Sequence, residues 1–388
     1  MGDRLRIALI THYPQDPTKI DGGIQAASAR LVAELRHIAG LEIHVLHCHS
    51  DVDESRTIVD GPLTIHFLAQ TRRRLIPNML TKVERLAHLL RRLAPDVVHA
   101  HGPNLAVAAL RAGYQPIWTI HGVVRQEATL YHGLFSRLNF ALARHYEQQA
   151  LAKVTRVTTV SPYVVEAYSR WGNAHWASRP ADWRIIDNPA PPDNFQLPRR
   201  PIAGRVFMPA SVIPLKDPLT LVRAAALLRQ RMPQLSVHIA GSLADSAYVE
   251  QVQREIDRAG LAEVVRLLGP LDTYALRAEL VAAAVVALPS RQEVAPMAVI
   301  EAMAAGVPVV ASATGGLPYL IEDRRTGYLA PAGDSAAFAV ALGELLEDAE
   351  LAQQIGAAAR ASALDRFRPA RVAASYLALY RSTWRPDG

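Results

Sequence analysis

The chain has 388 residues, of which half are apolar and 20% are charged, and its formal net charge is +6. These values exclude a disordered, collagen-like or low-complexity chain, and the length accommodates two ordinary hydrophobic cores. The single cysteine, Cys48, excludes an intramolecular disulfide and a zinc site built from several thiolates. The basic balance favours anionic partners such as nucleotides or anionic lipid. Because the charges are spread along the chain, without a basic tail, we expect no nucleic acid partner.

The apolar segments are all short. The stretch 5–11 is shorter than the core of a signal peptide, and His12 and Pro14 follow it at once. The longest apolar run, 281–289, is half of the ~20 residues that span a bilayer. We therefore expect a soluble, cytoplasmic protein.

The first half of the sequence alternates short apolar runs with segments whose apolar residues recur every three or four positions. Such alternation predicts βα units built around a parallel sheet. Strands are expected at residues 5–11, 42–48, 63–68, 96–100, 115–120, 156–160 and 184–187. Helices are expected at residues 24–38, 80–93 and 138–151.

The segment 188–201 interrupts this pattern. Its five prolines in fourteen residues exclude a helix and a central strand, so we interpret it as an interdomain linker. The alternation then restarts, with strands expected at 206–209, 236–240, 264–268, 285–288 and 308–311. Helices are expected at 219–231, 247–259, 275–284, 299–305, 336–348 and 369–384.

The whole pattern predicts an α/β protein of two tandem doubly wound domains, 1–195 and 196–368, followed by a final helix within 369–388. In open α/β sheets, ligands bind beyond the carboxyl ends of the strands, and two such domains leave a cleft between those ends. Residues that directly follow strands are therefore the first candidates for a functional site.

Two glycine pairs follow expected strands: Gly22 with Gly23, and Gly315 with Gly316. Paired glycines allow backbone N–H groups to approach a ligand closely, and a following helix N-terminus favours negative charge. The first pair lacks the Gly-x-Gly-x-x-Gly pattern of dinucleotide-binding folds. An ordinary turn explains each pair equally well.

Histidines follow two strands of the first domain. Alternation places His99 and His101 on one side of their strand, and His121 follows the next strand. A neutral imidazole donates and accepts hydrogen bonds, so it can orient a sugar hydroxyl near a reacting centre. The alternative for each is a buried histidine whose hydrogen bonds are satisfied within the core.

A third group of histidines, His44, His47 and His49, surrounds Cys48. One interpretation is a set of metal ligands. We favour an ordinary strand with partly exposed side chains, because we find no carboxylate following at ligand spacing.

Two acids and a lysine stand out in the second domain. Glu293 lies in the loop after strand 285–288, and Glu301 lies in the first turns of the next helix. Both carboxylates can accept hydrogen bonds from vicinal hydroxyls, and the helix N-terminus favours a diphosphate. Lys216 follows the first strand of this domain and can neutralise a leaving diphosphate. The alternatives are solvated helix charges for the acids and a surface cation for the lysine.

The run from Pro289 through Glu293, Glu301, Gly306 and Pro308 resembles the glutamate–seven residues–glutamate motif of retaining GT-B glycosyltransferases, family 4 (group 1 type). Further matching pieces occur in family order along nearly the whole chain. They are Gly22-Gly23-Ile24, His121-Gly122, Thr159-Val-Ser161-Pro, Ile186-Asp-Asn188-Pro, Ile239-Ala-Gly241, Leu268-Gly269, Arg366-Phe367 and Tyr376-Leu-Ala-Leu-Tyr380. The resemblance implies the GT-B fold, with two Rossmann-like domains facing a central cleft and a C-terminal helix that crosses back onto the N-terminal domain.

The resemblance also implies roles for the candidate residues. The donor is a nucleoside-diphosphate sugar, a co-substrate, and neither a metal nor another cofactor is expected. Glu301 would bind the ribose hydroxyls, Glu293 the donor sugar and Lys216 the diphosphate. His121, from the other domain, would face the donor sugar. The implied donor-binding residues are Glu301, Lys216, Ser211, Arg291, Pro296, Met297 and Ala298, and the implied acceptor or phosphate loops contain Gly22, Gly23, His101, Gly315 and Gly316.

This chain departs from the family pattern at three places. The family usually has Gly-Arg-Leu where Ala210, Ser211 and Val212 stand, so the diphosphate-binding arginine is missing there. Arg291 or an arginine of the first domain is the candidate replacement. Pro296 stands where the family has a residue with a backbone N–H, and Tyr319 replaces a frequent glutamate.

The expected reaction is hexosyl transfer to a saccharide or lipid-linked acceptor in bacterial cell-surface polysaccharide, lipopolysaccharide or glycolipid synthesis. The segment 71–80, with Arg91 and Arg92 downstream, joins cationic and apolar residues. One hypothesis is peripheral contact with the inner membrane, and the other is a solvated helix face. Two other functions stay open: a GT-B-like sugar-nucleotide epimerase, and a non-catalytic protein that binds nucleotide sugars.

Overall fold

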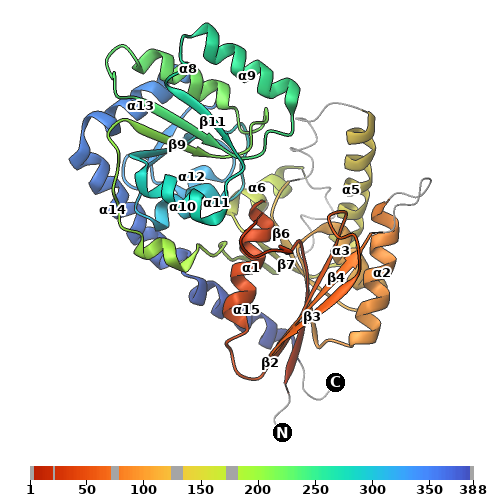
Figure 1. Cartoon of the computed structure of the whole chain (residues 1–388). Coiled ribbons are helices and arrows are strands. Elements are labelled where there is room, and N and C mark those ends of the chain that lie inside the picture. The colour runs from red at the N-terminus through yellow and green to blue at the C-terminus, as the bar shows by residue number, and fades with distance from the viewer. Residues whose placement is uncertain (1–3, 21, 71–77, 124–133, 172–181, 385–388) are drawn as a thin grey trace. The chain divides into compact units, whose positions relative to one another are not determined.

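The computed structural model describes residues 4–20, 22–70, 78–123, 134–171 and 182–384. The chain divides into two compact α/β units (Figure 1). Unit 1 comprises Met1–Pro17, Asp21–Asp187 and Pro369–Gly388, and unit 2 comprises Thr18–Ile20 and Asn188–Arg368. The division at residue 188 coincides with the start of the proline-rich segment.

Unit 1 is built around one sheet with helices on both faces. Its elements are β1 (Leu5–Ile10), α1 (Gly23–Leu35), β2 (Leu41–His49), β3 (Arg56–Asp60), β4 (Leu63–Ala69), α2 (Asn78–Leu93), β5 (Val97–Ala100), α3 (Pro103–Arg111), β6 (Ile117–Ile120), α5 (Leu134–Lys153), β7 (Arg156–Thr159), α6 (Pro162–Trp171), β8 (Asp182–Ile185) and α15 (Pro369–Thr383). Among the described residues the strand order is β3-β4-β2-β1-β5-β6-β7-β8. Helices α1 and α15 lie side by side on one face, and α2, α3 and α5 form a row on the other (Figure 1).

The parallel pairing predicted for unit 1 is confirmed for every strand pair except one. Strand β3 runs antiparallel to β4 at the edge of the sheet, and all five of its residues are exposed. Apolar periodicity does not reveal β3, because an exposed edge strand has no buried face. By contrast, β1 is buried along almost its whole length, as expected for a central parallel strand that is covered on both faces.

Helix α15 belongs to the core of unit 1. Its buried residues pack with β1, β2 and α1 in a single apolar cluster. The contributing side chains are Val372, Ala373, Tyr376, Leu379 and Tyr380. The C-terminal helix therefore returns to the first unit, as the family resemblance implied.

Unit 2 has a sheet whose described strands are all parallel, in the order β11-β10-β9-β12-β13-β14. Its elements are η1 (Pro192–Gln196), β9 (Arg205–Pro209), α8 (Pro218–Leu228), β10 (Ser236–Ala240), α9 (Ser246–Arg258), β11 (Val265–Gly269), α10 (Thr273–Ala282), β12 (Val285–Leu288), α11 (Met297–Ala304), β13 (Val309–Ser312), α12 (Leu317–Leu320), β14 (Tyr328–Ala330), α13 (Ser335–Glu347) and α14 (Ala349–Arg366). Helix α8 packs against α9 and α13, and α11 packs against α14.

Local sequence explains where several helices of unit 2 begin. Each of α9, α10, α13 and α14 is preceded by an aspartate whose carboxylate accepts a hydrogen bond from a backbone N–H of the first turn. This N-cap satisfies a donor that the helix itself leaves unpaired, and such a cap contributes about 1 kcal/mol to stability. The capping residues are Asp245, Asp272, Asp334 and Asp348.

Each sheet has one point where the strand order reverses direction. In unit 1 the chain lays β2 on one side of β1 and β5 on the other. In unit 2 it lays β10 on one side of β9 and β12 on the other. Ligands of open α/β sheets bind at such switch points, beyond the carboxyl ends of the strands. The loops after β1, β5, β9 and β12 are therefore the places to look for chemistry.

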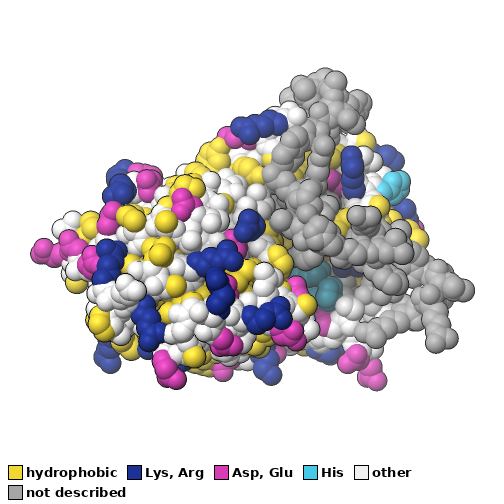
Figure 2. Space-filling view, turned by 90° about the horizontal axis from the view of Figure 1, so that it is seen from above, with side chains coloured by type: hydrophobic (Ala, Val, Ile, Leu, Met, Phe, Trp, Pro, Cys, Tyr) yellow, Lys and Arg dark blue, Asp and Glu magenta, His cyan; other side chains and the backbone are white. Residues whose placement is uncertain are grey.

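The distribution of surface charge and the length of the helices are relevant to nucleic acid and membrane partners. Lys and Arg side chains are interspersed with Asp and Glu side chains on the face that Figure 2 shows. In the described part of the chain, no helix combines the length and apolarity needed to cross a bilayer.

Candidate active site

Lys216 and Glu293 meet at the switch point of unit 2. Lys216 lies in the loop after β9, and Glu293 lies in the loop after β12, the neighbouring strand. The Lys216 ammonium donates a hydrogen bond to Glu293 Oε1 at 2.5 Å, and Ser290 Oγ donates to the same oxygen at 2.7 Å. Glu293 Oε2 accepts no hydrogen bond from the residues that the structure describes. The structure thus brings together two residues singled out from the sequence and leaves one carboxylate oxygen for a ligand.

Asp217 fixes the backbone directly after Lys216. It has the left-handed conformation, with φ of 46°, which aspartate tolerates better than most residues. Its buried carboxylate accepts a hydrogen bond from Thr220 Oγ1 at 2.8 Å and pairs with Arg291 Nη2 at 2.9 Å. Sequence reasoning missed this residue, although Asp-Pro at a helix start is a recognisable signal.

Arg291 lies beside the loop that carries Lys216. Its backbone N–H donates to the carbonyl of Leu215 at 2.9 Å, and its guanidinium, half exposed, contacts Asp217. Ser211 opens the same loop, where its carbonyl accepts a hydrogen bond from the N–H of Ile213. The structure therefore places an arginine next to the segment from which the family's usual arginine is missing.

The second glycine pair supports the loop that carries Arg291 and Glu293. The N–H of Gly316 donates to the Glu293 carbonyl at 2.9 Å, and Thr314 Oγ1 donates to the Arg291 carbonyl at 3.0 Å. Gly315 has φ of +56°, and a Cβ there would collide with the Glu293 carbonyl oxygen. Both the backbone angle and the close approach require glycine at this position.

Helix α11 begins directly after this loop. Pro296 is its N-cap, and Met297 and Ala298 form its first turn, where backbone N–H groups have no acceptor within the helix. Glu301 lies one turn further, and its carbonyl accepts a hydrogen bond from Asn194 Nδ2 at 3.2 Å. The two glutamates of the motif thus lie on one loop–helix segment at the carboxyl end of β12.

Unit 1 presents imidazoles at its own switch point. His101 follows β5 and His121 follows β6. His101 Nδ1 lies 3.1 Å from His121 Nε2 and 3.3 Å from Ser28 Oγ. Burial lowers the pKa of His121 to about 4 and the pKa of His101 well below its ordinary value. Both rings are therefore neutral at physiological pH.

The hydrogen-bonding partners of His101 favour one tautomer. His101 Nε2 is buried and has no hydrogen-bond partner in the described part of the chain. A buried N–H without an acceptor is less tolerable than a bare ring nitrogen, so the proton belongs on Nδ1. His101 then donates to His121 Nε2, which leaves the proton of His121 on its Nδ1. His101 thereby sets which nitrogen of His121 acts as a donor.

His99 is fully engaged within the core. Its Nδ1 lies 2.8 Å from the Tyr380 hydroxyl, and its Nε2 lies 2.6 Å from Thr119 Oγ1, which also contacts Thr158. Burial lowers the pKa of His99 to about 3. The structure therefore supports the structural alternative for this histidine, which joins β5, β6 and β7 to the C-terminal helix.

The first glycine pair begins α1, after the loop that follows β1. Gly22 is the N-cap with φ of +91°, and its carbonyl accepts a hydrogen bond from Ala26 N–H at 3.2 Å. Gly23 is the first helical residue. The pair therefore forms a helix start at the same sheet edge as His101.

His47 and His49 share a carboxylate. The N–H of Tyr13 donates to His47 Nδ1 at 2.9 Å, so His47 Nε2 carries a proton and donates to Asp51 Oδ1 at 3.0 Å. His49 Nδ1 lies 3.1 Å from the same oxygen. Asp51, just beyond β2, therefore lies within hydrogen-bond distance of both rings, a contact that was not predicted from the sequence.

His44 lies on the opposite side of β2 from His47, as alternation requires. It contacts His66 Nε2 at 3.2 Å and Glu42 Oε1 at 2.9 Å. The three histidines are therefore divided between two clusters. In the described part of the chain, no group of three or more potential ligands is arranged to hold a metal ion.

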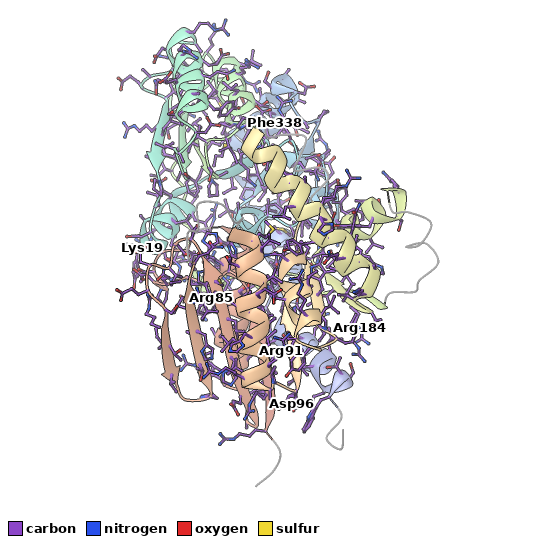
Figure 3. The ribbon with its side chains drawn as sticks, turned by 90° about the vertical axis from the view of Figure 1, so that its right-hand side faces the viewer. Lys19, Arg85, Arg91, Asp96, Arg184 and Phe338 are labelled. Carbon is purple, nitrogen blue, oxygen red and sulfur yellow. The ribbon has the colours of Figure 1, made fainter. Side chains whose placement is uncertain are left out.

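The cationic segment 71–80 lies largely outside the described residues. The structure describes the helix that follows, α2, from which Arg85 and Arg91 extend (Figure 3). Arg91 Nη2 donates to the carbonyl of Arg111 at 2.5 Å, so this arginine links α2 to α3.

Comparison with known proteins identifies the family. The model "Glycosyltransferase Family 4" matches residues 21–194, and the model "Glycosyl transferases group 1" matches residues 195–362. Together they span residues 21–362, from the first glycine pair into α14. The chain belongs to the group 1, family 4 glycosyltransferases.

Relatives of known name agree with this assignment. D-inositol 3-phosphate glycosyltransferase of Streptomyces scabiei is 36% identical over 230 residues, which cover 57% of this chain and 47% of that protein. The chain thus spans about half the length of the curated relatives it matches. Sucrose-phosphate synthase from Thermosynechococcus elongatus has a TM-score of 0.82 at 23% identity, covering 98% of this glycosyltransferase and 99% of that chain. HepE of Anabaena with UDP-glucose has a TM-score of 0.73 at 19% identity, covering 98% and 100%. These likenesses establish the GT-B fold.

Proposed function

We propose that this protein transfers a hexosyl group from a nucleoside-diphosphate sugar to a hydroxyl of a saccharide or lipid-linked acceptor. The observation that carries the proposal is the Lys216–Glu293 pair at the switch point of unit 2, in a chain of a glycosyltransferase family. The setting we propose is synthesis of a cell-surface glycoconjugate at the cytoplasmic face of the inner membrane.

Lys216 supplies the charge that a departing diphosphate requires. Its side chain is 23% exposed, so its ammonium can reach a ligand. Its hydrogen bond to Glu293 and the ion pair between Asp217 and Arg291 hold its loop in place. Negative charge grows on the bridging phosphate oxygen as the bond to the sugar breaks, and a fixed cation nearby lowers that barrier. Arg291 and the first N–H groups of α11, at Met297 and Ala298, add to the same positive field.

The two glutamates hold different parts of the donor. Glu293 Oε2 accepts a hydrogen bond from a hydroxyl of the donor sugar, since Oε1 is already engaged by Lys216 and Ser290. Glu301, one helical turn beyond the loop, accepts from the ribose hydroxyls. This division places the reacting sugar near Lys216 and the nucleoside further along α11.

Unit 1 contributes neutral donors and acceptors. With its Nε2 occupied by His101, His121 presents an Nδ1–H that orients a hydroxyl or carbonyl oxygen of the substrates. In the transfer we propose, the bond from the anomeric carbon to the phosphate oxygen breaks and its electron pair stays on that oxygen. The acceptor oxygen forms its bond on the same face, and its proton passes to the leaving phosphate. The configuration is retained, and Lys216 takes the electrostatic role without a metal.

A thermal-shift screen with UDP, GDP, ADP, CMP and NAD tests the donor site first. A ligand at 100 times its dissociation constant adds about 2.7 kcal/mol to stability, which a melting curve resolves. We expect a shift with one nucleoside diphosphate, and UDP is tested first because HepE was solved with UDP-glucose.

Product analysis with the matching nucleotide sugar then separates the alternatives. A transferase releases the nucleotide and moves the sugar to an acceptor. An epimerase alters the sugar while it stays attached, and a binding protein leaves the nucleotide sugar unchanged. The proposal fails if no nucleoside diphosphate shifts the melting curve, or if the sugar stays attached with every acceptor class.

A further inference from the structure

Four polar side chains at the carboxyl edge of the unit 1 sheet contact one another in a line. Thr11 follows β1 and Ser28 lies on α1, whereas His101 and His121 follow β5 and β6. Thr11 Oγ1 lies 2.6 Å from Ser28 Oγ, which lies 3.3 Å from His101 Nδ1. His101 Nδ1 in turn lies 3.1 Å from His121 Nε2. Because the first three side chains are buried, the hydrogen bonds between them are shielded from water. We call these four side chains the hydroxyl–imidazole line.

The line begins at a group that can only accept hydrogen bonds. Thr11 Oγ1 donates to the backbone carbonyl of His12 at 3.3 Å. A hydroxyl has a single proton, so Thr11 must accept its other hydrogen bond from Ser28. The proton of Ser28 is then directed at Thr11, and Ser28 Oγ can only accept from His101 Nδ1. The His12 carbonyl therefore fixes which member of each pair is the donor.

The same order follows from the other end of the line. The unpartnered Nε2 of His101 already places the proton of that ring on Nδ1. This N–H is shared between Ser28 Oγ and His121 Nε2, so His121 carries its own proton on Nδ1. In the reverse order, Ser28 would donate to His101, whose proton would move to the buried Nε2, where no described residue accepts it. Two separate observations thus give one arrangement of protons.

We propose that Thr11 and Ser28 are positioning residues that hold the proton of His121 on Nδ1. Thr11 acts through Ser28, and Ser28 acts through His101, so neither hydroxyl needs to touch a substrate. Their effect on transfer rests on the proposed function, in which His121 Nδ1–H orients a substrate oxygen, whereas the arrangement of protons does not. Since Ser28 lies on the helix that the first glycine pair begins, the line also connects that helix to His121.

The test removes the Thr11 hydroxyl and observes the ring of His121. Two-bond ¹H–¹⁵N correlations of the full chain, labelled with ¹⁵N-histidine, identify the protonated nitrogen, and loss of signals in His121→Gln assigns them. We expect Nδ1–H in wild type. In Thr11→Val, Ser28 loses its acceptor and can donate to His101, so we expect the tautomer ratio of His121 to shift about fivefold toward Nε2–H, as for one neutral hydrogen bond. Thr11→Ser restores the hydroxyl and should restore the wild-type ratio.

Two further variants separate positioning from packing. Once Ser28→Ala has removed the link, adding Thr11→Val should not change the tautomer ratio further, whereas two independent packing defects would add. Thr158→Val is the matched control, because it removes a buried strand hydroxyl of the same sheet that contacts Thr119 and no member of the line. The His121 signals of this control should match those of wild type.

Two spectra would overturn the proposal. One is a wild-type His121 with its proton on Nε2, a result that does not depend on any variant folding. The other is a tautomer ratio in Thr11→Val equal to that of wild type.

Initial rates with a nucleotide sugar test the consequence for transfer. In Thr11→Val, kcat should fall by the same factor as the fraction of His121 that carries Nδ1–H, with unchanged UDP affinity. A changed tautomer ratio with an unchanged kcat would overturn the positioning role. Absence of UDP binding or of sugar transfer in wild type contradicts the proposed function instead, so the two failures are distinguishable.

Discussion

The two switch points of this glycosyltransferase differ in charge: one is lined by charged side chains and the other by neutral imidazoles. In unit 2, a lysine, an arginine and a glutamate converge, and every loop that carries them is fastened by a buried aspartate or by backbone hydrogen bonds. In unit 1, the corresponding place holds neutral imidazoles that bind one another and the hydroxyls of the core. Fixed charge suits a group that gains charge as it leaves, and neutral imidazoles suit the positioning of hydroxyls. The difference predicts that charge removal in unit 2 and imidazole removal in unit 1 have different kinetic signatures.

The largest effect is expected from Lys216→Met. Removing one preorganised electrostatic partner from an active site typically costs 10²–10³ in rate, so we expect kcat/KM to fall about 10³-fold. Glu293 then loses its cation as well, which adds to the effect. Initial-rate measurements with a nucleotide sugar check this, with Lys19→Met as the control, because Lys19 is an exposed lysine of the same unit. An unchanged rate in Lys216→Met would contradict the proposal that the Lys216 charge contributes to the transfer step.

The two glutamates are expected to separate turnover from binding. Glu293→Gln keeps the size of the side chain but weakens the acceptor for the sugar hydroxyl, and we expect kcat to fall about 10²-fold. Glu301→Gln weakens ribose binding, and we expect the KM for the donor to rise about tenfold with a smaller change in kcat. Steady-state kinetics and UDP titration check both variants. Equal losses of UDP affinity in the two variants would contradict this division of roles.

Most of the fold could be predicted because the strands of both sheets are continuous apolar runs between amphipathic helices. Helices α3, α6, α12 and α14 were missed, as were strands β3 and β14. Strand β3 is exposed throughout, and β14 has three residues, so neither has a buried pattern long enough to detect. Apolar runs and apolar residues at helical spacing therefore predict the buried strands and helices of each unit. They do not predict the strands at its edges.

The candidate site could be predicted only in part. Lys216 and Glu293 were recognised because they lie in loops that follow strands, and the topology alone brings those strand ends together. Their supports could not be predicted, because the Asp217–Arg291 pair joins two loops that only the folded sheet makes neighbours. The same holds for the contact between His99 and Tyr380, whose residues are 281 positions apart.

Acid should weaken unit 1 through its buried imidazoles. The pKa of His99 is about 3 in the folded chain and close to 6.5 when unfolded, so between these values the unfolded state binds more protons. Stability therefore falls as the pH drops, and from pH 7 to pH 5 we expect His99 alone to account for ~2 kcal/mol. Urea unfolding at both pH values checks this in wild type and in His99→Gln, whose stability should fall less with acid. His88→Gln, which replaces an exposed histidine of α2, is the matched control.

The smallest effect is expected from the residue that sets the tautomer of His121. His101→Phe fills the space but cannot donate to His121 Nε2, so we expect kcat to fall about tenfold while the donor KM stays unchanged, a loss of about 1.4 kcal/mol. His101→Asn places an amide N–H near the position of Nδ1 and should recover most of that rate. Steady-state kinetics of both variants, with imidazole ¹⁵N shifts to identify the protonated nitrogen of His121, check the assignment. If His101→Asn and His101→Phe lose rate equally, His101 serves packing alone, and the neutral switch point of unit 1 depends on His121 without a positioning partner.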